Sequence, residues 1–242
     1  MRVSRAMVLA AGLGKRMMPL TRTVPKPLIP VLGRTMLDRH LDRLADAGIA
    51  TCVVNVHHLA GAIRAHLRDR TRPAIRISDE TGALLDTGGG VARALPLLGP
   101  DPFFVLNGDV VWDDGAEPAL SRLARGFDPA TLDAAILLVP RERASGYDGP
   151  GDFALDDAGR PRRRGGDAAA PFVFAGVQIV HPRLLDGAPA GAFSMNLAFD
   201  RAIAAGRLGA VIHDGAWYHV GTPDAIAATE ARMRAAARKA AP

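Results

Sequence analysis

With 242 residues, of which 48% are apolar and 23% charged, the chain can bury a hydrophobic core, and its composition excludes a disordered protein. The single cysteine, Cys52, excludes an intrachain disulfide, and the net charge of +5 suits an anionic ligand. No segment has the roughly 18 consecutive apolar residues of a membrane span, and Gly12 and Gly14 end the first apolar run too early for a signal peptide. We therefore expect a cytoplasmic protein without a membrane partner. Few aromatic residues accompany the basic ones, so nucleic acid is not an expected partner either.

Strands and helices are expected to alternate over the first half of the chain. The apolar run Ala6–Ala10 predicts a buried strand that ends at a glycine-rich loop. Residues 35–48 have apolar side chains at helical spacing, with Thr35 as a candidate N-cap and Gly48 as a candidate stop. The same reasoning predicts strands at 51–56, 75–78 and 103–106, and helices at about 59–67 and from about 87 to 95. This alternation is typical of a parallel sheet covered by helices on both faces.

The second half of the chain is less regular. Two expected strands, 152–155 and 172–180, flank a turn-rich stretch and indicate a small antiparallel insertion that could act as a lid. The other expected elements are strands at 134–139, 210–213 and 217–220, a helix at 193–205 and a final helix that begins at Thr222. Without an internal repeat or a long linker, we expect one domain over 1–242, with halves of about 1–110 and 111–242.

Two segments rich in chemically active residues follow expected strands of this sheet. One is the loop after Ala10, and the other is Asn107-Gly108-Asp109. In open parallel sheets, ligands bind beyond the carboxyl ends of the strands. The two segments are therefore expected to share a ligand site.

The loop at residues 9–21 has the composition of a phosphate-binding segment. Its small residues allow close approach of the backbone to a ligand, and Lys15 and Arg16 add positive charge. A P-loop is excluded because Arg16 stands where Ser or Thr is needed. A dinucleotide-binding turn is disfavoured because prolines from Pro19 onward prevent the helix that should follow it. The remaining interpretation is a long phosphate-wrapping loop that carries its own cations, with Lys26 held between two prolines.

These residues closely resemble the sugar nucleotidyltransferase family, whose hallmark is L-A-A-G-x-G-x-R-x-x-P-L-T followed by P-K-P. The hallmark stands here at residues 9–21 and 25–27. The resemblance continues through Leu85-Asp-Thr-Gly-Gly-Gly, Asn107-Gly-Asp, Phe174-Ala-Gly and Val220-Gly-Thr-Pro, and so covers nearly the whole chain. It implies a Rossmann-like mixed sheet, mainly parallel and flanked by helices. It also implies that a sugar 1-phosphate attacks the α-phosphorus of a nucleoside triphosphate.

The resemblance also implies roles for individual residues. The expected catalytic residues are Arg16, which would stabilise the leaving group, Lys26, which would meet both reacting phosphates, and Asp109, which would bind Mg²⁺. The expected nucleotide-binding residues are Arg16 and Lys26 together with Ala10, Ala11, Gly12, Gly14, Lys15, Asp86, Thr87, Gly88 and Gly89. The expected sugar-binding residues are Asn107, Asp152 and Gly176.

Two positions depart from the family pattern. Relatives commonly have an aspartate two residues before the late Gly-Thr, as a second metal carboxylate, whereas this chain has His219. Imidazole is a poor ligand for Mg²⁺ and suits Mn²⁺ better. We therefore expect either a metal held by Asp109, phosphates and water, or a metal preference shifted by His219. Met18 also stands where relatives often have a second arginine, which predicts weaker triphosphate binding.

Within the family, the chain is most similar to uridylyltransferases that act on N-acetylmuramic acid 1-phosphate in peptidoglycan recycling. The resemblance rests on its compact length, Gly151-Asp152-Phe153 and the Leu85 motif. Guanylyltransferases of mannose 1-phosphate are the alternative, because no motif specifies the base. A regulatory subunit that binds nucleotide without turnover is a further alternative, suggested by His219 and Met18 but opposed by Arg16, Lys26 and Asp109.

Overall fold

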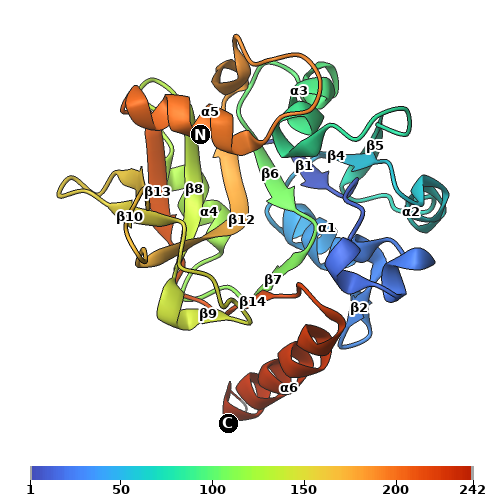
Figure 1. Cartoon of the computed structure of the whole chain (residues 1–242). Coiled ribbons are helices and arrows are strands. Elements are labelled where there is room, and N and C mark those ends of the chain that lie inside the picture. The colour runs from blue at the N-terminus through green and yellow to red at the C-terminus, as the bar shows by residue number, and fades with distance from the viewer. Residues whose placement is uncertain (1, 241–242) are drawn as a thin grey trace.

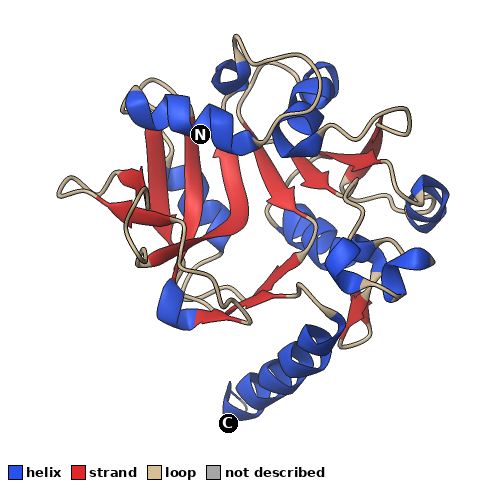
Figure 2. Cartoon of the chain, viewed as in Figure 1, coloured by secondary structure: helices blue, strands red, loops and turns tan. Residues whose placement is uncertain are grey.

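The computed structural model describes residues 2–240, and these form an α/β fold around a mixed sheet of nine strands (Figures 1 and 2). One path through the sheet has the order β11-β10-β12-β6-β1-β4-β5, and β8 pairs with both β12 and β13. The strands of this sheet are β1 (Arg5–Leu9), β4 (Thr51–Val56), β5 (Ala74–Asp79), β6 (Phe103–Asn107), β8 (Ala134–Pro140), β10 (Phe153–Leu155), β11 (Pro161–Arg163), β12 (Phe172–Val180) and β13 (Leu208–Ile212).

Two small sheets accompany the main one. They comprise β2 (Pro30–Val31) with β3 (Arg34–Thr35), and β7 (Val110–Trp112) with β9 (Ala144–Ser145) and β14 (Trp217–His219). The α-helices are α1 (Met36–Asp46), α2 (Ala60–His66), α3 (Asp86–Leu98), α4 (Ala119–Gly126), α5 (Met195–Ala204) and α6 (Pro223–Ala240). The short 3₁₀ helices are Lys15–Met17, Leu20–Arg22, Lys26–Leu28, Arg141–Arg143 and Pro182–Leu185. None of the helices within the described residues combines the length and apolarity needed to cross a bilayer.

Helices cover both faces of the sheet, and the alternation of side chains along the strands explains why. In β1, Ala6 and Val8 join one core cluster, which contains Leu37 and Leu41 of α1, whereas Met7 joins another. The first cluster also includes residues of α4, and the second includes residues of α3 and α5. Because successive side chains of a strand point to opposite faces, α1 and α4 cover one face and α3 and α5 the other. The expected parallel sheet with helices on both faces is confirmed.

Every strand and helix predicted in the first half is present in the structure, whereas the hairpin of β2 and β3 was not predicted. Thr35 caps α1, since its hydroxyl oxygen accepts a hydrogen bond from the Asp38 amide at 3.0 Å. Pairing of β1 with β4 and β6, and of β4 with β5, is parallel. The carboxyl ends of these strands therefore meet at one edge of the sheet, where the glycine loop begins.

The second half differs from the prediction in the position of β12. The antiparallel arrangement that the sequence suggested for 152–180 is confirmed, because β10 pairs antiparallel with β12 and also with β11, a strand that was not predicted. These strands do not form a separate excursion, however, since all three belong to the main sheet. β12 pairs antiparallel with both β6 and β8 inside the main sheet. Through this pairing, β12 joins the parallel strands of the first half to those of the second half. Its buried side chains contribute to both core clusters.

Candidate active site

The glycine loop and the Asn107-Gly108-Asp109 turn touch each other at the carboxyl edge of the sheet. The Gly108 amide donates to the carbonyl of Leu9 at 3.0 Å. A Cβ atom at position 108 would lie 2.4 Å from that carbonyl oxygen, so only glycine allows this approach. The parallel pairing of β1 with β6 thus brings together the two segments that the sequence singled out.

Backbone amides of the loop remain free to bind an anion. Gly14 has φ of 62°, and its carbonyl accepts hydrogen bonds from the Met17 amide and from the Thr21 hydroxyl at 2.9 Å. A Cβ at Gly14 would lie 2.8 Å from Cγ2 of Thr21, so the turn requires glycine. Within the described part of the chain, no hydrogen bond is donated by the amides of residues 11–14. Ala10 differs, because its amide donates to Oδ1 of Asn55 at 2.7 Å.

Lys26 and Asp109 form an ion pair at the floor of this region. Nζ of Lys26 donates to Oδ2 of Asp109 at 2.8 Å, and only 8% of Lys26 is exposed. Burial alone would raise the pKa of Asp109, but the charge and hydrogen bond of Lys26 lower it below its ordinary value, with further help from His219 and Arg16. The carboxylate is therefore ionised at neutral pH.

Arg16 and His219 lie beside this pair. Nη1 of Arg16 is 3.5 Å from Nε2 of His219. Burial, followed by the opposing influences of Asp109 and of the cations Lys26 and Arg16, leaves the pKa of His219 below its ordinary value. Four predicted site residues from distant parts of the sequence are thus brought together, with a lysine and an arginine around one carboxylate.

A cavity of about 580 Å³ opens next to these residues. Its lining includes predicted residues of the loop, the turn and the start of α3, namely Ala10, Ala11, Gly12, Gly14, Lys15, Arg16, Lys26, Asp86, Thr87, Asn107 and Asp109. Such a volume falls in the usual range of small-ligand sites. One cavity therefore collects most of the residues for which the sequence predicted a nucleotide-binding or catalytic role.

Gly88 and Gly89 lie behind this lining. Their amides donate to the carbonyl of Phe193 at 2.9 and 3.1 Å, and a Cβ at Gly88 would lie 2.4 Å from the Phe193 ring. The hydroxyl of Thr87 accepts from the Met195 amide at 2.9 Å. The two glycines thus allow α3 to pack closely against the segment that leads into α5.

The predicted sugar-binding residues surround the irregular part of β12. Gly176 has φ of 74° at a register shift between Phe174 and Gln178, and a Cβ there would lie 3.0 Å from Cβ of Asn107. Oδ2 of Asp152 accepts from the Phe174 amide at 2.9 Å. Asn107 lines the cavity, whereas Asp152 and Gly176 shape the backbone next to it.

Sequence reasoning missed two buried polar residues of the cavity wall. Asn55 and Glu80 are each 2% exposed, and Nδ2 of Asn55 donates to Oε1 of Glu80 at 2.7 Å. Together with the bond from Ala10 to Asn55, this contact ties the ends of β1, β4 and β5. Their positions at or just after the ends of two parallel strands were the available signal, since ligand-site residues gather there.

The donor set fits a metal ion that takes most of its ligands from phosphate. In the described residues, no group of three or more His, Cys, Asp or Glu side chains is placed to hold a metal. Asp109 is a lone carboxylate with a third of its side chain exposed. One carboxylate together with substrate phosphates and water is a common arrangement for Mg²⁺.

Comparison with known proteins identifies related sequences along most of the chain. The family model described as "Nucleotidyl transferase" matches residues 5–149. N-acetylmuramate alpha-1-phosphate uridylyltransferase of Caulobacter vibrioides is 43% identical, with 94% of this chain and 96% of that protein covered. The enzyme of the same name from Neisseria meningitidis serogroup B is 38% identical, with 90% of this chain and 93% of that protein covered.

Further matches share less of the sequence, and one of them is a solved structure with the same fold. The mannose-1-phosphate guanylyltransferase catalytic subunit beta of Drosophila pseudoobscura pseudoobscura is 36% identical over 46% of this chain and 31% of its own length. The solved structure of the inositol-1-phosphate CTP transferase from T. maritima superposes with a TM-score of 0.75 at 17% identity, covering 93% of this chain and 92% of that one. At that identity, the superposition establishes the fold alone.

Proposed function

Because this chain belongs to the nucleotidyl transferase family, we propose that it joins UTP to N-acetylmuramic acid α-1-phosphate and releases pyrophosphate, in the recycling of cell-wall sugar. The observation that carries the reaction type is the convergence of Arg16, Lys26 and Asp109 beside the free amides of the glycine loop. The choice of substrate pair rests on the two relatives with nearly full coverage.

The proposed reaction is a displacement at the α-phosphorus. A phosphate oxygen of the sugar 1-phosphate attacks that phosphorus, the bond between it and the oxygen bridging to the β-phosphorus breaks, and pyrophosphate leaves with the electron pair. Negative charge builds up on both sides of the α-phosphate, so the protein has mainly to position the reactants and neutralise charge.

Each residue of the cluster has a role in this proposal. The amides from Ala11 to Gly14 bind phosphate oxygens, and Lys15 adds charge at the exposed rim. Arg16 neutralises the departing pyrophosphate, and Lys26 bridges the α-phosphate and the sugar phosphate. Lys26 must then exchange its contact with Asp109 for contacts with phosphate.

Members of this family commonly use a divalent metal, and Asp109 is the residue that would hold it here, with Mg²⁺ as the expected ion and Mn²⁺ as the alternative. When bound, such an ion neutralises phosphate charge and compensates Asp109 for the loss of Lys26. The ionised state of Asp109 at neutral pH supports this role, because a protonated carboxyl group is a poor ligand.

Two further surfaces complete the proposed site. Asp86 and Thr87, backed by Gly88 and Gly89, form the wall for the base and ribose. Asn107, together with the backbone shaped by Asp152 and Gly176, receives the sugar. Mannose 1-phosphate and GTP remain the alternative pair, with weaker support, since one guanylyltransferase match covers under half of this chain and another covers 90% of it at only 28% identity.

Pyrophosphate release measured with each of four nucleoside triphosphates against a panel of sugar 1-phosphates tests the proposal. We expect the highest kcat/KM with UTP and N-acetylmuramic acid α-1-phosphate. Lys26→Met should lower kcat/KM for release roughly 10³-fold, and Arg68→Ala, a change at an exposed arginine, serves as the control. A preference for GTP and mannose 1-phosphate would transfer the assignment to the alternative pair. No pyrophosphate release with any pair of the panel would instead support a regulatory subunit.

A further inference from the structure

His219 is fixed beside Asp109 by the pairing of β14 with β7. In this register His219 lies opposite Val110, the residue that follows Asp109. Two neighbours restrict the imidazole. The ring of Trp217 stacks on it with centroids 6.1 Å apart. Gly221 also lies close to it, since a Cβ atom at that position would be only 2.5 Å from Nε2 of His219. Trp217 is itself anchored, because its Nε1 donates to the carbonyl of Ala175 at 3.0 Å.

The fixed imidazole faces the guanidinium group of Arg16. The two nitrogens are 3.5 Å apart, and within residues 2–240 Arg16 has no carboxylate partner. Arg16 is exposed and follows a glycine loop, so without this neighbour its side chain would sample many rotamers. His219 is therefore the contact that limits where Arg16 points.

The imidazole also sets the charge of the cluster. Arg16 and Lys26 contribute two positive charges, and Asp109 contributes one negative charge. An imidazole is neutral or cationic but never an anion. Asp148, a further carboxylate that influences His219, is exposed and therefore screened by water. Arg16, Lys26, Asp109 and His219 consequently keep a net positive charge without any bound metal. Of the other charged residues that line the cavity, Lys15 adds to this charge, and Asp86 and Glu80 oppose it.

From this geometry we infer that His219 is a positioning residue, which holds Arg16 toward the cavity and keeps the cluster cationic, so that the triphosphate binds before any divalent cation. The inference rests on the proposed function, because it assumes that the cluster receives a nucleoside triphosphate. It differs from a role of His219 as a metal ligand, which would make metal binding depend on the imidazole.

Calorimetric titration of UTP into the full chain in the presence of EDTA tests the charge argument. His219→Asp adds a negative charge and should weaken this metal-free binding at least tenfold. His219→Gln keeps a neutral polar group of similar reach and should stay within about threefold of the parent. Equal affinities for the parent and His219→Asp, with both folded by circular dichroism, would overturn the inference.

A double-mutant cycle tests whether His219 acts through Arg16. His219→Ala should lower metal-free UTP affinity in the parent but have no effect in an Arg16→Ala background. The same loss in both backgrounds would contradict a positioning role, because a general structural defect acts whether or not Arg16 is present.

Repeating the UTP titration with saturating Mn²⁺ in place of EDTA separates positioning from metal ligation, because the ratio of the two affinities gives the gain in UTP affinity that the metal supplies. Asp109→Ala should abolish this gain, whereas His219→Ala should leave it unchanged. A tenfold smaller gain with His219→Ala would make His219 a ligand and overturn the inference. Failure of the parent chain both to bind UTP and to release pyrophosphate would instead overturn the proposed function itself.

Discussion

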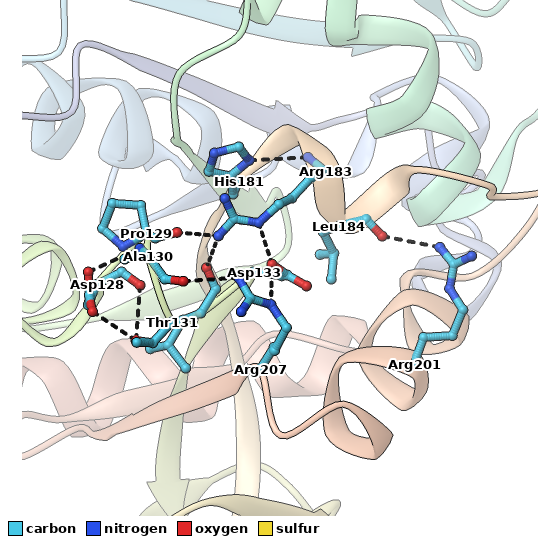
Figure 3. A network of polar contacts seen from close by, with 11 residues as sticks. Asp128, Pro129, Ala130, Thr131, Asp133, His181, Arg183, Leu184, Arg201 and Arg207 are labelled. Atoms are coloured by element: carbon cyan, nitrogen blue, oxygen red, sulfur yellow. Dashed lines mark hydrogen bonds and ion pairs between the residues drawn. The ribbon is translucent and has the colours of Figure 1, made fainter.

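Two clusters of charged residues, each with one aspartate between two cations, lie at opposite edges of the main sheet, one formed by the carboxyl ends of the parallel strands and the other by their amino ends. β6 and β8 both pair antiparallel with β12 and so run in the same direction. Asp109 follows the last residues of β6, whereas Asp133 precedes the first residue of β8. Figure 3 shows Arg183 and Arg207 converging on Asp133. At the other edge, Lys26 and Arg16 lie around Asp109.

The two clusters differ in what else their donors contact. Arg183 also donates to the carbonyls of Pro129 and Leu132, and Arg207 to that of Ala130. At the cavity edge, Asp109 is the one acceptor of Lys26 among residues 2–240, and His219 is the one polar side chain there in contact with the Arg16 guanidinium. Donors consumed by backbone carbonyls stabilise the fold, and donors held by one exchangeable partner remain available to a ligand. If the proposed function is correct, similar residue types serve stability at one edge and binding at the other.

The largest expected effect that sharpens this comparison is the loss of turnover in Lys26→Met. Removing the cation that meets both reacting phosphates should lower kcat/KM roughly 10³-fold, about 4 kcal/mol of transition-state stabilisation. The free energy of unfolding should also fall, by about 1–2 kcal/mol, because Asp109 loses the cation that pairs with it, although a third of the Asp109 side chain is exposed to water. Initial rates and urea unfolding measure both. A loss of stability without a loss of turnover would reverse the roles assigned to the two clusters.

The matched change at the other edge, Arg183→Met, should have the opposite profile. It leaves Asp133 with one cation and the carbonyls of Pro129 and Leu132 without their donor, which should cost about 2–3 kcal/mol of unfolding free energy. Turnover per folded molecule should stay within about twofold of the parent. An effect on kcat/KM as large as that of Lys26→Met would show that the two edges are coupled.

The response to acid should also mark Asp133 as a stabilising residue. Burial alone would raise the pKa of Asp133, but hydrogen bonds and charges of Arg183 and Arg207 lower it below its ordinary value of 3.8. A carboxyl group whose pKa is lower in the folded than in the unfolded protein stabilises the fold above about pH 4, and this contribution is lost as pH falls through the folded value. Urea midpoints between pH 3 and 6 should therefore fall less steeply for Asp133→Asn than for the parent. Identical slopes would contradict the linkage.

The smallest expected effect concerns Lys15, which is exposed at the rim and makes no ion pair within the described residues. Lys15→Ala should raise KM for UTP roughly three- to fivefold with little change in kcat, because a solvated charge attracts the triphosphate without a fixed contact. KM measured at two salt concentrations checks this, since the difference between variant and parent should shrink at high salt. A change in kcat would instead give Lys15 a direct part in the reaction.

The two halves of the chain were not equally readable from sequence. In the first half, strands and helices alternate with clear periodicity, and strands joined by helical crossovers run parallel to one another. In the second half, the turn-rich stretch at 156–171 concealed that β12 returns to the centre of the sheet. The short helix α4 was missed as well, although Ala119, Leu120 and Leu123 lie at helical spacing. Eight residues of pattern are too few to distinguish a helix from a loop without its packing surface.

By itself, the sequence predicted which residues are suited to bind phosphate and at which strand ends they lie. Glycine, proline and lysine and the spacing of apolar residues make this possible, because each affects the backbone or charge of its own segment. Only the tertiary structure decided their partners. It placed Asp109 on Lys26 and His219 against Arg16, with Gly88 and Gly89 under Phe193 and the Ala10 amide on Asn55. Such contacts join residues far apart in the chain, and a local pattern carries no information about which of several polar groups will lie within hydrogen-bond distance after the sheet has formed.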